Sequence, residues 1–159
     1  MTYTPTFSYR KGRGFTLVEL MVVLILMAIL MAIGVPSYRG FILNQRLITT
    51  TADLRIALVT ARSEAVKRNR TVKVLPNDGD WGSGWNVPSP EAGDPVLLNH
   101  VQTGPVAITN LSDNPEFMPS GRVLAPSNFE IEVGPEANKL TGCLRLRTDG
   151  RTEFKKAAC

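Results

Sequence analysis

Residues 14–36 read GFTLVELMVVLILMAILMAIGVP, and this stretch decides the fold. Between Phe15 and Val35 it carries a single charged residue, Glu19. A helix of about 20 residues spans roughly 30 Å, the thickness of the hydrocarbon core of a bilayer. The sequence therefore predicts a membrane-inserted helix over residues 15–35.

The charges that precede this helix predict its orientation. Residues 1–14 contain Arg10, Lys11 and Arg13 and no acidic residue. Basic residues beside a membrane helix are retained in the cytoplasm, so we expect a single-pass chain with a cytoplasmic N-terminus and an exported remainder. Without these three bases, 15 of the 18 Lys and Arg residues remain against 14 Asp and Glu residues, so the exported part is not strongly basic.

Two simpler interpretations of residues 15–35 stay open. A secretory signal peptide has an apolar region of only about 7–15 residues, although Ala32-Ile33-Gly34 could serve as its cleavage site. A plain membrane anchor fits the length but gives no reason for Glu19, because a charge in the membrane costs about 2.5–3.5 kcal/mol. Glu19 therefore indicates a function beyond anchoring.

The sequence predicts that the helix continues over residues 36–70 as an amphipathic segment. Apolar residues at helical spacing form one stripe, consisting of Leu47, Leu54, Leu58, Ala61 and Ala65. Basic residues are expected mostly on the other faces: Arg39, Arg46, Arg55, Arg62, Lys67 and Arg68. The whole helix would be about 80 Å long, with a kink or local melting at Pro36.

Residues 71–159 have the pattern of a β-sheet head. Residues 71–75 alternate and end at Pro76, and the sequence Asn77-Asp78-Gly79-Asp80 predicts a turn. Further strands are expected at residues 85–87, 96–98, 106–108, 129–133 and 143–147. The expected fold class is α+β, a long N-terminal helix followed by an antiparallel β-sheet head.

The first residues of the apolar segment resemble a known signature. Gly14-Phe15-Thr16-Leu17-Val18-Glu19, followed by a membrane helix, is similar to the prepilin motif of type IV pilins and type II secretion pseudopilins. The resemblance implies that residues 1–14 are a leader, cut between Gly14 and Phe15 by the prepilin peptidase, and that Phe15 is then N-methylated. It also implies that Glu19 serves assembly, because its carboxylate can neutralise the new amine of a neighbouring subunit in an apolar filament.

Later motifs resemble the GspH/FimT branch of this family. They are Ala61-Arg62-Ser63-Glu64-Ala65-Val66-Lys67-Arg68 followed by Thr71-Val72, the hairpin Trp81-Gly82-Ser83-Gly84-Trp85, the turn Phe117-Met118-Pro119-Ser120-Gly121-Arg122, and Asp149-Gly150-Arg151. The resemblance assigns residues 71–159 to a periplasmic β head of the GspH/FimT type.

Cys143 and Cys159 are the only cysteines in the chain. Two thiols and one histidine are too few for a zinc site, whereas in an oxidising periplasm a disulfide is expected. Such a bond closes a loop of about 15 residues and stabilises the fold by roughly 3 kcal/mol on the chain-entropy estimate.

The same loop carries five basic residues near two acids, Asp149 and Glu153. The bases are Arg145, Arg147, Arg151, Lys155 and Lys156. Some FimT-like minor pilins bind DNA through a C-terminal Gly-Arg-x-Arg element, but here Gly150-Arg151-Thr152-Glu153 has an acid in place of the second arginine. Lys155 and Lys156 offer compensating charge, since attraction to phosphate does not depend on sequence. DNA binding therefore stands as an alternative to a solvated basic edge.

The sequence predicts no catalytic residue, no metal site and no cofactor, since it has no phosphate-binding loop, nucleophile elbow or metal-ligand spacing. Trp81 and Trp85 are expected to pack on their own hairpin rather than to form a stacking platform for sugars or bases. His100 is expected to be a solvated loop residue.

The sequence thus predicts a non-enzymatic minor pilin or pseudopilin of the GspH/FimT type, a structural subunit incorporated into or at the tip of a type IV pilus. The alternatives are a minor pseudopilin of a type II protein secretion system and a DNA-binding minor pilin of natural transformation. The expected partners are other pilins in a filament, the prepilin peptidase and the bacterial inner membrane, from which the head projects into the periplasm before assembly.

Overall fold

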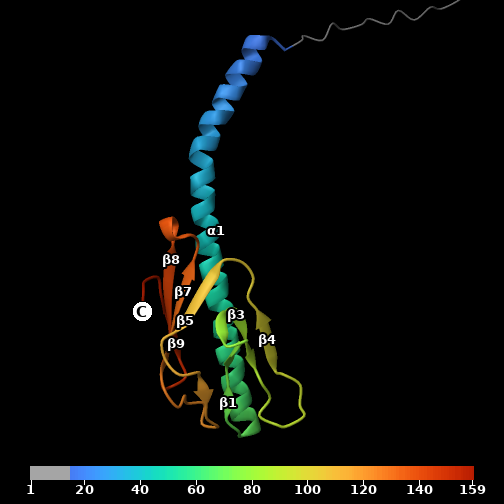
Figure 1. Ribbon diagram of the computed structural model, residues 1–159, viewed down its shortest axis with the longest axis vertical. Helices are drawn as coiled ribbons and strands as arrows, with labels where there is room; N and C mark the ends of the chain where they lie inside the picture. The colour runs from blue at the N-terminus through green and yellow to red at the C-terminus, as the bar shows by residue number, and fades with distance from the viewer. Residues whose placement is uncertain (1–14) are drawn as a thin grey trace, which may run out of the picture. The chain divides into compact units, whose positions relative to one another are not determined.

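The computed structural model of the chain describes residues 15–159, and the predicted leader, with Gly14, lies outside them. The described residues form one long helix, nine strands and one 3-10 turn (Figure 1). They divide into two units, one ending at Tyr38 and the other Arg39–Cys159, and each is described by itself.

Helix α1 (Leu17–Arg68) has 52 residues and runs through both units. It is helical at residue 36 as well, so the local melting predicted there is not found. The helix ends at a C-terminal cap in which Asn69 adopts a positive φ of 53°. The N–H of Asn69 donates to the carbonyl of Val66, and the N–H of Arg70 donates to that of Ala65. This pair of hydrogen bonds is the Schellman motif, which stops a helix by satisfying its last carbonyls.

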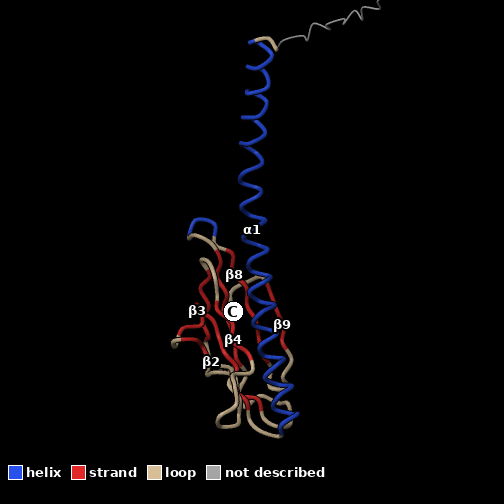
Figure 2. The backbone as a smooth tube through the Cα atoms, turned by 90° about the vertical axis from the view of Figure 1, so that its right-hand side faces the viewer, coloured by secondary structure: helices blue, strands red, loops and turns tan. Residues whose placement is uncertain are grey.

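The head is built from antiparallel strands in three sheets. In chain order the elements are β1 (Val72–Lys73), β2 (Leu75–Asn77), β3 (Asp80–Val87), β4 (Leu98–Val101), β5 (Val106–Asn110), β6 (Glu116–Phe117), β7 (Ser127–Val133), the 3-10 turn η1 (Glu136–Asn138), β8 (Leu140–Leu146) and β9 (Thr152–Lys155). The sheet orders are β1-β6, β2-β3-β4 and β5-β7-β8-β9. Within the unit Arg39–Cys159, the strands lie along the helix (Figure 2). The predicted α+β class is therefore confirmed.

The first predicted strand differs in detail from the observed one. It is split into β1 and β2, and Pro76 lies inside β2 rather than ending the strand. Because β2 is an edge strand, a residue without an N–H is tolerated there, and the register shifts at Pro76/Asn77. The predicted turn follows at Asp78 and Gly79, both with positive φ, as a tight hairpin requires. The fourth strand begins later than predicted, at Leu98, and β6 and β9 were not predicted.

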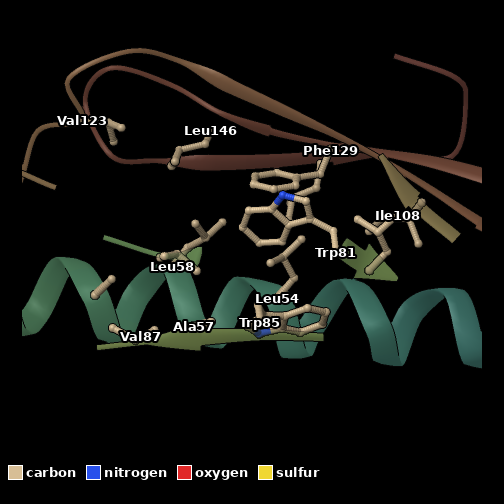
Figure 3. Packing of buried hydrophobic residues seen from close by; sticks show 14 of the residues in the cluster. Leu54, Ala57, Leu58, Trp81, Trp85, Val87, Ile108, Val123, Phe129 and Leu146 are labelled. Atoms are coloured by element: carbon tan, nitrogen blue, oxygen red, sulfur yellow. The ribbon is translucent and has the colours of Figure 1, made fainter. Parts of the chain in front are cut away.

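The core forms between one face of α1 and the sheets. All five residues of the predicted stripe, from Leu47 to Ala65, are buried, and Ala57, Thr50 and Thr51 extend the same face. The sheets contribute fully buried side chains from five strands: Val72, Trp85, Val87, Phe117, Phe129, Ile131, Leu144 and Leu146. Trp81 lies beside Phe129 in an edge-to-face contact, with ring centroids 4.8 Å apart (Figure 3). Burial of this apolar surface holds the head together.

The two tryptophans belong to the interior rather than to a binding platform, and His100 stacks on one of them. Trp81 and Trp85 are both buried, so a stacking platform for sugars or bases is excluded at these rings. His100 was expected in a solvated loop, and this expectation is wrong. It lies in β4, half-buried, with its ring stacked on Trp85 at a centroid distance of 4.3 Å.

Two glycine turns meet at the side chain of Arg62. Gly121 and Gly150 both have positive φ, 73° and 77°, and both are buried. A Cβ added at Gly150 would lie 2.6 Å from the carbonyl oxygen of Gly121, and one added at either glycine would lie within 3.2 Å of Arg62. The Arg62 guanidinium donates to the Gly150 carbonyl at 3.4 Å, and the N–H of Val123 joins the turns by donating to the carbonyl of Thr148. The two Gly-Arg turns singled out in the sequence are therefore packing elements that fix the end of the head to α1.

Candidate assembly surfaces

The N-terminal part of α1 exposes all of its large apolar side chains. From Phe15 to Val35 their exposed fractions range from 42% at Val23 to 77% at Phe15. Of the described residues, only α1 is long and apolar enough to cross a membrane. A soluble protein rarely leaves so large an apolar surface in water, because its hydration is unfavourable. This surface therefore requires a lipid or protein environment.

Glu19 closes a capping box at the start of this helix. Thr16 is the residue that precedes α1, and its hydroxyl accepts a hydrogen bond from the Glu19 N–H at 3.2 Å. In return, the N–H and the hydroxyl of Thr16 each lie 3.4 Å from Glu19 Oε2. Reciprocal bonds of this kind satisfy N–H groups that a helix start otherwise leaves unpaired. The spacing Thr-x-x-Glu before an apolar run was the available signal for this cap, and the sequence analysis missed it.

The cap uses only one of the two carboxylate oxygens of Glu19. Both contacts to Thr16 use Oε2, and within residues 15–159 neither a hydrogen bond nor an ion pair engages Oε1. One oxygen of Glu19 can therefore cap its own helix while the other accepts a hydrogen bond from a cation. A charged group in an apolar environment needs such a partner.

A second apolar stripe runs along the part of α1 that belongs to the head unit, from Arg39 to Arg68. Large apolar residues at helical spacing are exposed on the face that points away from the core: Phe41, Ile48, Ile56, Val59 and Val66. Ala52 is exposed on the same face. At about 100° per residue, these positions fall within roughly 80° of one another and lie nearly opposite the buried stripe. Bases were predicted on most of the faces away from the core, and this stripe was not predicted, because the prediction rested on one apolar periodicity.

The C-terminal tail lies on the outer face of the sheet β5-β7-β8-β9. A disulfide joins Cys143 of β8 to Cys159, with their Cα atoms 5.0 Å apart, so the predicted bond is present. The N–H of Cys159 donates to Glu130 of β7 at 2.9 Å, and Arg145 donates to the Cys159 carbonyl at 3.3 Å. The bond therefore holds the tail across neighbouring strands, where a chain terminus would otherwise fray.

Among the five bases of the C-terminal loop, Arg145 and Lys155 lie on the exposed face of the β8–β9 ladder, whereas Lys156 contacts α1. Arg145 lies opposite Glu153 in the β8–β9 ladder, and Lys155 forms an ion pair with Glu153 at 3.3 Å. Lys156 donates to Asn44 of α1 at 2.6 Å and so points in another direction. Arg147 and Arg151 flank the turn that carries Asp149, and Arg151 lies 3.8 Å from its carboxylate. Acids are thus interspersed among these bases, and DNA binding stays a prediction.

Asp149 shows how closely these charges interact. Its pKa is lowered from the usual value, first because the N–H of Arg151 donates to its carboxylate, and then because Arg147 and Arg151 are near. Asp149 is therefore ionised at neutral pH and offsets part of the positive charge at this turn.

A shallow groove lies between α1 and the edge strand β4. Its larger part, about 340 Å³, is lined mainly by polar side chains, including Arg46, Asp53 and His100. In the described part of the chain, no three His, Cys, Asp or Glu side chains are grouped as metal ligands would be.

Comparisons with known proteins agree with this arrangement. Residues 50–150 match the family described as type II transport protein GspH, and residues 9–35 match the prokaryotic N-terminal methylation motif. Prepilin peptidase-dependent protein D of Escherichia coli is 59% identical over 32 residues, which are 20% of this chain and 22% of that protein. The chain thus matches about a fifth of the length of this curated relative.

Two crystal structures of the type IV minor pilin FimU from Pseudomonas aeruginosa have a similar fold. One has a TM-score of 0.57 at 21% identity and covers 70% of this chain and 90% of that one. The other has a TM-score of 0.54 at 22% identity and covers 69% and 92%. At this level of identity the likeness shows a shared fold, a long N-terminal helix followed by antiparallel sheets.

Proposed function

Because this chain belongs to the family of the type II transport protein GspH, we propose that it is a minor pilin or pseudopilin, a structural subunit that enters a filament through α1. The observation that carries the proposal is the pairing of an exposed apolar helix with one carboxylate at its start. A plain anchor needs only the apolar surface, whereas a subunit that leaves the bilayer for a filament needs its charged groups neutralised.

We further propose how the N-terminus is prepared. The prepilin peptidase cuts between Gly14 and Phe15, and the new amine of Phe15 is methylated. The match to the N-terminal methylation motif supports this processing. Glu19 Oε1 then accepts a hydrogen bond from the amine of a neighbouring subunit, while Oε2 continues to cap its own helix.

The proposed location follows from the same features. Residues 15–35 hold the subunit in the bacterial inner membrane until assembly, and the head, residues 71–159 with the helical segment 36–70, stands in the periplasm. The bases of the leader support a cytoplasmic N-terminus. The disulfide Cys143–Cys159 supports a periplasmic head, because such bonds persist in oxidising compartments.

We propose the type IV pilus as the machine that this subunit serves, with the type II secretion system as the alternative. The fold shared with a type IV minor pilin supports the first choice, while the family description supports the second. The choice therefore has to be made in cells that lack one machine or the other.

Fractionation of the host cells tests the proposal. The processed wild-type chain is expected in the membranes and in filaments sheared from the cell surface, and in cells without the pilus assembly ATPase it should be absent from the sheared fraction. The variant Gly14→Leu should accumulate in the membrane as a precursor that is longer by the 14 residues of the leader. A wild-type chain that is never shortened and never leaves the membrane would contradict the proposal.

A further inference from the structure

Two exposed cations border the second apolar stripe, Arg55 on one side and Lys67 on the other, and Lys67 is paired with Glu64 at 3.5 Å. Arg55 is exposed on α1, between Ile48 and Val59 and one residue before Ile56. Residues three and four positions away along a helix are its surface neighbours, and toward the stripe these are Ala52 and Val59. Arg55 is thus an exposed cation at the edge of the stripe, beside Ala52 and Val59.

Within residues 15–159, Arg55 has no carboxylate partner. Between Arg39 and Arg68, the acidic residues of α1 are Asp53 and Glu64. Asp53 lies about 160° around the helix from Arg55. Glu64 is held by Arg68 at 2.7 Å and by Lys67 at 3.5 Å. In the isolated subunit, water solvates Arg55.

Covering the stripe would remove that water. The stripe extends from Phe41 to Val66, about 38 Å along the axis, which suits a partner helix packed alongside. A cation buried at such a contact is costly unless a carboxylate meets it, whereas a matched pair fixes register and excludes wrong partners. Arg55 therefore selects for an acidic residue at its own level on the partner.

A second copy of this chain does not supply that residue in a helix-on-helix contact. The stripe itself contains no acid, so stacking two stripes leaves each Arg55 against apolar side chains or another Arg55. Reaching Asp53 would require the partner helix to turn by about 100° from the middle of its stripe, toward the side on which Asp53 lines the groove beside β4. Like charges placed against one another are unfavourable, so contact between two copies is disfavoured.

We propose that the stripe Phe41–Val66 binds the helix of a different pilin-like subunit, which carries a carboxylate opposite Arg55, and that Arg55 is the specificity-determining residue of this contact. The inference rests on the proposed function, since it names the kind of neighbour that the subunit has in the filament. The stripe supplies the apolar contact area, and Arg55 decides which helix occupies it.

Photo-crosslinking in the host cells tests the proposal on the full-length protein. The photoreactive residue p-benzoylphenylalanine replaces Val59, which is 57% exposed. The expected adduct joins this chain to a pilin-like subunit of another sequence, identified by mass spectrometry. Arg55→Glu should lower the adduct yield at least about tenfold, because it sets two carboxylates against each other. Arg55→Lys should retain most of the yield, and Arg55→Met should lie between these two.

The control is Lys155→Glu, which makes the same change of charge at an exposed cation of β9 that is paired with Glu153 and is not part of α1. Its adduct yield should equal that of the wild type. Resistance of the head to proteolysis in each variant shows that folding is intact, as expected for an exposed Arg55.

The contradicting outcomes are separable. If the main adduct is a homodimer, or if Arg55→Glu crosslinks as well as the wild type while both are found in sheared filaments, the inference fails and the proposed function stands. If Arg55→Met crosslinks as well as the wild type, the carboxylate partner is disproved. If the wild type is absent from filaments, the proposed function and the inference both fail.

Discussion

The N-terminal segment and the head use apolar residues in opposite ways. From Phe15 to Val35 the large apolar side chains are all exposed, whereas in the head the largest ones, such as Trp85 and Phe129, are completely buried. The head therefore carries its stabilising contacts within itself. The N-terminal segment gains its contacts only from lipid or from other subunits, so its stability is a property of the membrane or the filament.

Helix α1 joins the two regions and shows the same contrast around its axis. In the head half, one face is buried by the sheets, and the opposite face exposes a second apolar stripe. Substitutions on the buried face are therefore expected to destabilise the head, whereas substitutions on the exposed face are expected to leave it folded.

The largest effect is expected when the same substitution, Phe to Ala, is made in the core of the head and on the exposed stripe of α1. Phe129→Ala removes a fully buried ring and should destabilise the head by about 3–5 kcal/mol. Phe41→Ala, on the exposed stripe, should change the stability by less than about 0.5 kcal/mol. Urea denaturation of residues 39–159 measures both free energies of unfolding, and equal effects would contradict the distinction between the core and the exposed stripe.

The next effect concerns the tail. Replacing both Cys143 and Cys159 by serine should lower the free energy of unfolding by about 3 kcal/mol, because the unfolded chain is no longer constrained. Reduction of the wild-type head with dithiothreitol is the matched control and should give a similar loss. No loss in either case would mean that the tail is held by its hydrogen bonds alone.

A smaller effect separates two arginines of α1. Arg62→Ala removes the side chain against which the turns at Gly121 and Gly150 pack, and should cost on the order of 1 kcal/mol. Arg55→Ala removes an exposed side chain that has no partner within the described residues and should be neutral for the head. Thermal unfolding of the two variants distinguishes them, and the reverse order would contradict the assignment of faces.

The smallest effect is a dependence on pH. The pKa of Glu64 is lowered chiefly by its hydrogen bond from Arg68, and that of Asp80 by the N–H of Gly82. A lowered pKa in the folded state means that the stabilisation is present above the pKa of the unfolded chain and is lost as the pH falls through the folded value. The head should therefore become less stable in acid, and Glu64→Gln should flatten this dependence. An unchanged slope in that variant would remove Glu64 from the explanation.

The sequence predicted those parts of the fold that have a strong local signal. The apolar run, the stripe from Leu47 to Ala65 and the turn at Asp78-Gly79 were all predictable, because each depends on spacing within one element. The edge strand β9 and the stacking of His100 on Trp85 were not, because pairing between distant segments places them. Pro76 was misread for a related reason, since only the sheet order shows that β2 is an edge.

The residues of the candidate assembly surfaces also differ in whether the sequence predicted them. Gly14, Phe15 and Glu19 were singled out by resemblance to a motif, and their roles remain predictions. The capping box of Thr16 and Glu19 and the second stripe were in the sequence but were overlooked. A role for Arg55 in binding a partner could be inferred only from the structure, which shows which face of α1 the sheets leave exposed.

The most direct test of the account separates the two uses of Glu19. Glu19→Gln keeps a side chain that can cap the helix but removes the charge, whereas Thr16→Ala removes the cap and keeps the charge. Each full-length variant is compared in sheared filaments and in membranes of the host. The account predicts that Glu19→Gln, like Glu19→Ala, inserts into the membrane normally but is nearly absent from filaments, while Thr16→Ala is incorporated. Normal incorporation of Glu19→Gln would contradict it and would reduce Glu19 to a helix cap.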